Sequence, residues 1–385
     1  MTALTLRGGM VWDGRADALR EASVVVDEGK IAAIGTGAAS GTALDISGCT
    51  ALPGLIEGHA HLCFNAASNW RAVFDSDTPG RMLLRMVAHG RTMLEAGITT
   101  VRDLGAPTGL AIEIREAFAS GLAPGPDLLV SGAPITTTGG HCWFMGGEAD
   151  GELELRKAVR GLVKAGVDWI KVMATGGSMT RGTNTLAAQY STGELRAIVE
   201  EAHRLGRRVA AHCHGTAGIR AAVEAGVDSL EHCSFAGPDG VDRDDALIDR
   251  IAASNTIVSQ TISVGYRRWL DDGQRRQRSE LLQRILKTGC RMIASTDCGI
   301  PNVGHAELAG GLEVFSELGG LSPVQVLRLA TSASGELLGM ADRGALEPGR
   351  RADVLVVSGD PTANLGALTR VRYVIKGGQV VYAAP

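Results

Sequence analysis

The stretch LPGLIEGHAHLCF, residues 52–64, begins with apolar, strand-like residues and then places two histidines, His59 and His61, one residue apart. Side chains at positions i and i+2 of a β-strand point to the same side. The two imidazoles are therefore expected to converge on one point. The chain has nine histidines in all, and this spacing favours a metal site if distant segments supply further ligands.

Beyond this stretch, short β-branched runs alternate with longer amphipathic segments. The segments predicted as strands are 52–62, 98–105, 127–132, 168–177, 208–215, 228–234, 256–261 and 291–299. Helical patterns such as 193–206 and 216–227 lie between them, and the glycines at 97, 166 and 226 are placed as left-handed helix caps. This alternation predicts an α/β fold, most simply a (β/α)8 TIM barrel.

The two ends of the chain have a different pattern. They contain short strand-like runs with Asp, Glu and Gly turns and no helical pattern between them, at 4–14, 22–35, 352–359 and 371–382. We predict a small β-sandwich built from both termini. The alternative is a pair of unrelated hairpins, which would leave strand edges exposed. The predicted domains are residues 1–54 and 346–385 for the two parts of the sandwich and 55–345 for a metal-dependent hydrolase barrel.

The composition excludes several classes of protein. The chain has 385 residues, is 45% hydrophobic and 21% charged, and carries a net charge of −4. These values are ordinary for a soluble globular protein and indicate neither a nucleic-acid nor a membrane partner. We find no signal-peptide pattern, and no apolar run approaches the roughly 18–20 residues that a membrane span needs.

The cysteines indicate a reducing compartment. There are seven of them, scattered and without a CxxC pair, so we predict a cytoplasmic protein without a disulfide framework. We expect the four cysteines next to candidate ligands to be small buried residues and not metal ligands; they are Cys63, Cys213, Cys233 and Cys298. Cys142, beside His141, is left open.

Metal-competent side chains fall near the ends of five predicted strands. They are His59, His61, Lys171, His212, His232 and Asp297. Active sites of such barrels lie at the C-terminal ends of the strands. A single histidine there is commonly structural, but buried polar groups are costly unless they are paired or bound to metal. Their repetition on one rim therefore favours a metal centre.

Lys171 stands inside an apolar strand although only six of the 38 basic residues are lysines. A buried amine, unlike a guanidinium, can lose its proton and add carbon dioxide. The resulting carbamate is an anionic ligand with two oxygens, able to bridge two metal ions. The alternative is a lysine that forms a salt bridge across the barrel.

The segments GHAHL, WIKVMATGG, AAHCHG, EHCSF and STDCG, in that order, resemble the amidohydrolase superfamily. The resemblance is to its binuclear zinc branch, with Xaa-Pro dipeptidase (prolidase)-like and imidazolonepropionase-like members, and it covers essentially the whole chain. It implies two Zn²⁺ per chain: His59, His61 and Asp297 at the more buried ion, His212 and His232 at the more exposed one. Carboxylated Lys171 would bind both. It also implies a homo-oligomer.

The activity implied by the resemblance is hydrolysis of an amide-type C–N bond in a small molecule, such as a dipeptide, an N-acyl amino acid, a cyclic amide, a urea or a carbamate. A zinc-bridging hydroxide would attack the carbonyl, with Asp297 as proton shuttle. His141 would lie near the carbonyl or a substrate carboxylate. Two positions depart from relatives, many of which have Asp at Glu57 and, among prolidase-like members, often Tyr at His214. His214 shares a strand face with His212 and is expected to contact substrate.

Loop residues give further candidates for substrate binding. Trp143 either forms an apolar wall or packs its loop on the barrel. Tyr266 and Arg267 begin the arginine-rich segment 263–280, which either closes over a substrate carboxylate or forms a solvated helix face.

Two other functions are also compatible with the sequence. A mononuclear deaminase or imidazolone-type ring hydrolase on the same barrel would use Lys171 only structurally. A non-catalytic scaffold would usually have lost ligands, and all six positions are present here.

Overall fold

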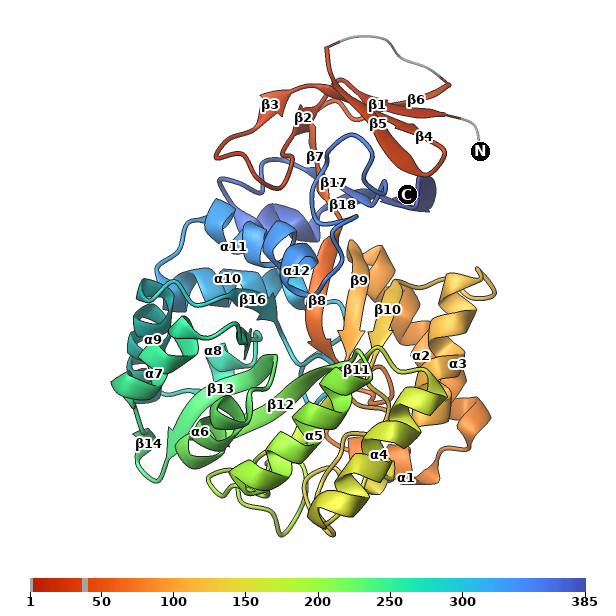
Figure 1. The fold of residues 1–385 in the computed structure, drawn as a ribbon. Helices are drawn as coiled ribbons and strands as arrows, with labels where there is room; N and C mark the ends of the chain where they lie inside the picture. The colour runs from red at the N-terminus through yellow and green to blue at the C-terminus, as the bar shows by residue number, and fades with distance from the viewer. Residues whose placement is uncertain (1–2, 37–40) are drawn as a thin grey trace.

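The computed structural model describes residues 3–36 and 41–385. It is an α/β protein (Figure 1). One part consists of parallel strands with helices, and beside it lie two further sheets whose strands come from segments near the two ends of the chain. One parallel sheet has the order β10-β9-β8 and the other β11-β12-β13-β15-β16. The parallel strands are β8 (Leu55–Ala60), β9 (Ile98–Asp103), β10 (Asp127–Val130), β11 (Trp169–Met173), β12 (Arg208–Gly215), β13 (Ser229–Gly237), β15 (Ile257–Thr261) and β16 (Met292–Ser295). The predicted alternation of strands and helices is confirmed.

The two parallel sheets are linked at their edges by single bridges. Ala60 pairs in parallel with Cys298, and Ile135 pairs in parallel with Val172. The amide of Asp297 donates to the carbonyl of His59 at 3.0 Å. The end of β8 and the segment after β16, which are far apart in the sequence, therefore lie side by side.

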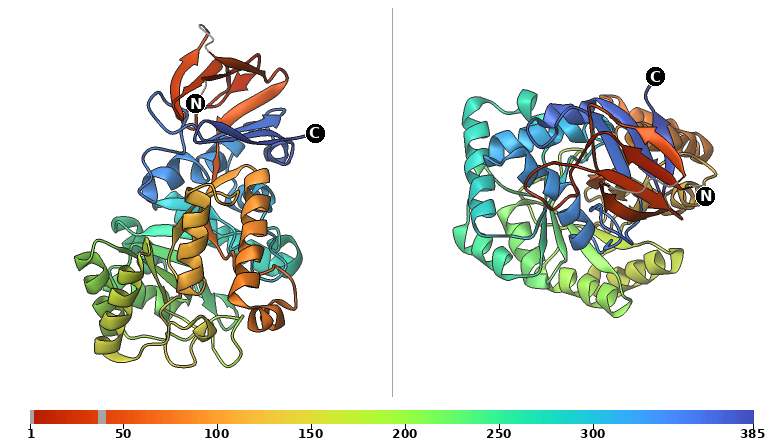
Figure 2. Two further views of the ribbon diagram at one scale, coloured as in Figure 1. Left: turned by 90° about the vertical axis from the view of Figure 1, so that its right-hand side faces the viewer. Right: turned by 90° about the horizontal axis from the view of Figure 1, so that it is seen from above.

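Helices cover the outside of the parallel strands (Figure 2). They are α1 (Trp70–Ser76), α2 (Pro79–Glu95), α3 (Thr108–Ala119), α4 (Gly151–Ala165), α5 (Thr192–Arg204), α6 (Thr216–Ala225), α7 (Asp245–Ala253), α8 (Tyr266–Trp269), α9 (Asp272–Lys287), α10 (Leu308–Gly319), α11 (Pro323–Leu329) and α12 (Ser332–Leu337), with 3-10 turns η1 (Trp143–Met145) and η2 (Leu365–Thr369). Gly166 and Gly226 cap α4 and α6 at φ values of 93° and 86°, as predicted. None of the helices in the described residues is long and apolar enough to cross a membrane.

An apolar cluster joins the strands near their N-terminal ends. It contains Ile56, Trp169, Ala210, Ile257 and Ile293, one residue from each of five strands. On β8, β11, β12 and β15 these residues lie nearer the start of the strand than the polar side chains that line the cavity described below. The burial of this cluster stabilises the N-terminal end of the strand assembly. The polar side chains lie at the C-terminal end.

The two remaining sheets contain strands from near both ends of the chain. Their orders are β5-β4-β1-β6 and β19-β18-β17-β7-β2-β3. The strands are β1 (Leu4–Arg7), β2 (Met10–Val11), β3 (Arg20–Glu21), β4 (Ser23–Asp27), β5 (Lys30–Gly35), β6 (Thr42–Asp45), β7 (Cys49–Pro53), β17 (Val354–Ser358), β18 (Val371–Lys376) and β19 (Gln379–Ala383); the short β14 (Gly240–Val241) pairs with β13. One apolar cluster joins the two sheets, with Leu6 and Val24 from the first and Val354 and Ile375 from the second.

The segment predicted as one strand, 52–62, is two strands that meet at Gly54. Before Gly54 the chain belongs to β7, which pairs with β17, and after it to β8, which pairs with β9. A Cβ atom on Gly54 would lie 2.3 Å from Oγ1 of Thr99, so only glycine fits this crossing. A continuous apolar run conceals the break because both strands are buried.

Candidate metal centre

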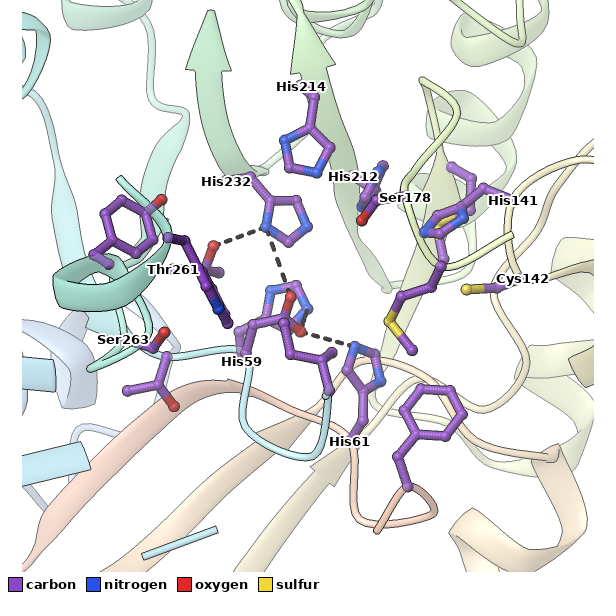
Figure 3. A pocket seen from close by; sticks show the side chains of 18 of the residues that line it. His59, His61, His141, Cys142, Ser178, His212, His214, His232, Thr261 and Ser263 are labelled. Atoms are coloured by element: carbon purple, nitrogen blue, oxygen red, sulfur yellow. Dashed lines mark hydrogen bonds and ion pairs between the residues drawn. The ribbon is translucent and has the colours of Figure 1, made fainter. Parts of the chain in front are cut away.

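A cavity of about 270 Å³ lies where strands of both parallel sheets end, and Figure 3 shows the side chains around it. Nine of the residues singled out from the sequence line it: His59, His61, His141, Lys171, His212, His214, His232, Tyr266 and Asp297. They come from segments more than 200 residues apart in the chain. The fold therefore brings the predicted metal ligands together.

His59, His61 and Asp297 form the first cluster, with one candidate ligand atom from each within 4.8 Å of the others. Nε2 of His61 lies 3.1 Å and Nε2 of His59 lies 3.4 Å from Oδ1 of Asp297. The Nδ1 atom of His61 donates to the carbonyl of Gly105 at 3.0 Å, and that of His59 donates to Glu231 at 2.9 Å. Nε2 of His59 therefore presents a lone pair to the cavity. Burial lowers the pKa of His61, but the hydrogen bond and charge of Asp297 outweigh it and raise that pKa overall.

The close approach of these atoms shows whether the first cluster fits a metal ion. Oδ1 of Asp297 is buried and makes no well-directed hydrogen bond with any described residue. Burial also keeps the pKa of His59 well below its usual value, so its imidazole is neutral. Two ring nitrogens and a carboxylate oxygen this close together need a positive charge among them, supplied either by a metal ion or by the proton that Asp297 favours on His61. Nitrogen and oxygen ligands of this kind fit zinc.

His212, His214 and His232 form the second cluster, again with candidate ligand atoms within 4.8 Å of one another. Nε2 of His212 donates to the carbonyl of Gly176 at 3.2 Å, which leaves its Nδ1 bare. The Nδ1 atoms of His214 and His232 lie 2.7 Å and 2.8 Å from the hydroxyls of Ser234 and Thr261. Figure 3 shows the three rings gathered on one side of the cavity.

Both clusters include a residue with an unusual backbone conformation. His232 and Asp297 have φ values of 66° and 62°, in the left-handed region that non-glycine residues seldom adopt. On an ideal strand, Glu231 and His232 would face opposite sides. The left-handed turn at His232 brings its ring to the cavity while Glu231 stays in the interior. Such strain is typical of functional sites.

Lys171 lies between the clusters and is 1% exposed. Its Nζ is 3.5 Å from Nε2 of His59. Burial lowers the pKa of Lys171, although the negative charges of Glu231 and Asp297 act in the opposite direction. The neighbourhood therefore favours the neutral amine more than water does.

His141 faces the cavity from the loop before η1. Its Nδ1 lies 3.0 Å from the hydroxyl of Thr180, and its amide donates to Gln189. Burial lowers the pKa of His141 to about 3, so the ring is neutral at pH 7. The neighbouring Cys142 also lines the cavity, and burial raises the pKa of its thiol to about 12.

The other cysteines near the ligands are buried, as predicted. Cys63, Cys213, Cys233 and Cys298 are at most 1% exposed, and burial raises the pKa of each thiol. A protonated thiol is a poor metal ligand. The alternation that places Cys213 away from the cavity also brings His212 and His214 to it.

Trp143 and Arg267, two of the candidates for substrate binding, are not among the described residues that line the cavity. Trp143 is 40% exposed, and the guanidinium of Arg267 pairs with Glu313 and Glu317 on α10. Arg278, six residues into α9, lines the cavity instead and donates to the carbonyl of Ser234. The arginine-rich segment carries its charges around a helix, and only the tertiary packing decides which of them faces inward.

Four residues that line the cavity or lie beside its ligands are not evident from the sequence. Arg278 is one of many arginines in its segment, and Thr261 ends an ordinary strand pattern. Arg102 and Glu231 form a fully buried ion pair at 2.8 Å. A signal did exist for Arg102, because an arginine inside the apolar strand ITTVRD requires a buried partner.

Glu57 holds the two edges of the site together. Its carboxylate accepts hydrogen bonds from the amides of His59 at 3.1 Å and Thr296 at 2.9 Å and from the hydroxyl of Thr296 at 2.6 Å. Burial raises the pKa of Glu57 to about 7. The side chain thus ties β8 to the residue before Asp297.

Comparison with known proteins supports the resemblance to the amidohydrolase superfamily. The Amidohydrolase family profile matches residues 50–381. An ochratoxinase from Aspergillus niger is 28% identical over 97% of this chain and 85% of its own length. An imidazolonepropionase from Deinococcus radiodurans is 27% identical over 89% of this chain and 86% of its own. A crystal structure of a Xaa-Pro dipeptidase with bound methionine superposes with a TM-score of 0.86 and 26% identity over the full length of both chains.

The matched region includes every candidate ligand, and the cavity holds the clustered histidines that a metal-dependent hydrolase needs. The resemblance found in the sequence is thereby confirmed. The chain belongs to the amidohydrolase family and is a hydrolase that acts on carbon–nitrogen bonds.

Proposed function

We propose that this enzyme uses two metal ions to hydrolyse the amide bond of a small substrate that carries a carboxylate. The observation that carries the proposal is the convergence of two ligand clusters on one cavity with a buried lysine between them. The proposal includes a barrel closed through the bridges Ala60–Cys298 and Ile135–Val172 and a terminal β-sandwich.

The residues present fit two zinc ions. His59, His61 and Asp297 would hold one ion, and His212 and His232 the other, with Lys171 joining them as a carbamate. The lowered pKa of Lys171 supports this step, because only the neutral amine adds carbon dioxide. Bound zinc supplies Lewis-acid polarisation of a carbonyl and acidifies a coordinated water.

The chain's own groups would manage protons and charge. Asp297 lies at the centre of the site, with Oδ1 near His61 and Oδ2 4.0 Å from Nδ1 of His232. A carboxylate in this position can take a proton from attacking water and return it to the leaving nitrogen. The neutral ring of His141 is suited to donate a hydrogen bond to a substrate carbonyl.

The cavity walls indicate the substrate class. One side presents the guanidinium of Arg278 beside His214, whose pKa is lowered to about 3 by burial and by the nearby charges of Arg278 and Lys171. The cavity also has an apolar lining: Phe64, Met173, Met179, Trp269, Leu270 and Ile300. Arginine recognises carboxylates. A substrate with a carboxylate at one end and an apolar body, such as a dipeptide or an N-acyl amino acid, matches both features and the small volume.

The test is an activity panel with zinc-reconstituted enzyme. N-acyl amino acids and dipeptides are expected to be hydrolysed, whereas matched substrates whose carboxylate is converted to a primary amide should be poor. Lactams and ureas complete the panel. Release of ammonia from ring amines alone would contradict the proposal and favour a deaminase.

A further inference from the structure

A complete ion pair lies inside the protein without lining the cavity. Arg102 and Glu231 are both 0% exposed, and Nη2 of Arg102 donates to Oε1 of Glu231 at 2.8 Å. Nε of Arg102 donates to the carbonyl of Gly58 at 2.7 Å, and its guanidinium lies 4.7 Å from the ring centre of Trp169. Desolvation of two charges is expensive and must be offset by specific contacts. The pair therefore needs a reason beyond stability.

The second oxygen of Glu231 points to the first ligand cluster. It accepts the Nδ1 hydrogen of His59 at 2.9 Å, while Oε1 also accepts from the hydroxyl of Ser229 at 2.5 Å. Because a carboxylate can only accept, the proton of His59 is fixed on Nδ1. Nε2 is then bare, and it lies 3.4 Å from Oδ1 of Asp297.

Within the described chain, one ring nitrogen of each other candidate ligand histidine forms its hydrogen bond with a neutral group, although the carboxylate of Asp297 also lies near His61 and His232. Nδ1 of His61 donates to the carbonyl of Gly105, and Nε2 of His212 donates to that of Gly176. His232 is next to the hydroxyl of Thr261. A carboxylate partner makes an imidazole a stronger ligand than a carbonyl or hydroxyl does. The two clusters therefore differ in one respect that bears directly on metal affinity.

We propose that Glu231 is a positioning residue that makes the two metal sites unequal. It fixes the tautomer of His59 and strengthens the site of His59, His61 and Asp297, while Arg102 compensates the buried negative charge. The other site lacks such a partner and binds its ion more weakly. This inference rests on the proposed function only in requiring that the clusters bind metal.

The test compares Glu231→Gln with Thr261→Val. Metal-free proteins are titrated with Zn²⁺ by equilibrium dialysis with metal analysis, and with Co²⁺ followed by visible absorption. In Glu231→Gln, the amide oxygen faces Arg102 and the amide hydrogens face Nδ1 of His59, which moves the imidazole proton to Nε2. The tighter site should weaken by about 10–100-fold while the weaker site keeps its affinity. Thr261→Val should weaken only the other site.

A separate measurement reports the tautomer directly. Nitrogen-15 NMR of metal-free enzyme should show His59 protonated on Nδ1 in the wild type and on Nε2 in Glu231→Gln, assigned with a His59→Gln reference. Equal zinc affinities of the tighter site in wild type and Glu231→Gln, or an unchanged tautomer, would overturn the inference.

Folding is controlled by a variant that leaves no charge unpaired. If Glu231→Gln does not fold, Arg102→Met/Glu231→Gln removes both charges and is expected to show the same selective loss, since buried pairs are replaced together more easily than singly. A double variant with wild-type affinity at both sites would contradict the inference. Wild-type enzyme that binds no Zn²⁺ would instead overturn the proposed function.

Discussion

The two ligand clusters share one cavity but are supported in different ways. The cluster of His59, His61 and Asp297 is held by the buried carboxylates of Glu57 and Glu231 and by the backbone bond between His59 and Asp297. The cluster of His212, His214 and His232 is held by a carbonyl and two hydroxyls. It also faces Arg278 and the substrate space.

This difference indicates a division of roles within one site. The carboxylate of Glu231 is a stronger hydrogen-bond acceptor than a carbonyl or hydroxyl, so we expect the first cluster to be held more firmly. The second cluster has neutral partners and adjoins the surface that we assign to substrate recognition. Substitutions in each of the two regions test this difference.

Asp297→Asn should have the largest effect because it removes both an anionic ligand and the proposed proton carrier of the first cluster. We expect kcat on an N-acyl amino acid to fall by about 10²–10⁴-fold. The measurement is steady-state kinetics on preparations of known metal content. Asp342→Asn, which changes an exposed carboxylate paired with Arg343, is the control and should leave kcat unaltered. An Asp297→Asn enzyme with more than a tenth of wild-type kcat would contradict this role.

Lys171→Arg tests the link between the clusters. A guanidinium cannot form a carbamate at this position, so we expect one bound zinc in place of two and a loss of kcat of roughly 10²-fold or more. Carbon-13 NMR after incubation with labelled bicarbonate should show a carbamate signal in the wild type and in Lys157→Arg but none in Lys171→Arg. Full activity with a single zinc would favour the mononuclear alternative.

Arg278→Gln and Arg267→Gln separate the inward-facing arginine from its exposed neighbour. Loss of one charge-assisted hydrogen bond is worth about 1.5–3 kcal/mol. We therefore expect KM of Arg278→Gln for a carboxylate-bearing substrate to rise about 10–100-fold, with bound metal unchanged. Arg267→Gln should behave like the wild type because its partners are Glu313 and Glu317. The opposite ranking would favour the alternative in which Arg267 binds the substrate carboxylate.

Ser234→Ala should have the smallest effect. It removes the neutral partner of His214 but keeps the backbone carbonyl that accepts from Arg278. A neutral hydrogen bond contributes about 0.5–1.5 kcal/mol, so KM should change by about 2–10-fold. Ser76→Ala on the exposed end of α1 is the matched control. A loss of kcat/KM as large as that of Asp297→Asn would contradict this ranking.

The sequence predicts this fold well because its signals are local. Strand and helix periodicity identifies the parallel strands, and glycine at 166 and 226 marks two helix ends. The same periodicity places His212 and His214 on one face. It does not reveal that segment 52–62 is two strands, because burial of both makes the apolar run continuous.

The sequence predicts which residues form most of the site but not how they are arranged. Residue type and strand position suffice to select His59, Lys171 and Asp297. They also select His232, but they do not predict the left-handed backbone that turns its ring to the cavity. They do not suffice for Arg278, since a helix with many arginines gives each the same local pattern.

Short-range periodicity in the sequence specifies which strands exist and which of them end in imidazole, amine or carboxylate groups. How those strand ends are supported depends on tertiary packing. Glu231 reaches His59 across 172 positions of chain and Arg102 reaches Glu231 across 129. No local pattern specifies such contacts, since they depend on which buried charges the packed strands bring within a few ångströms of each other.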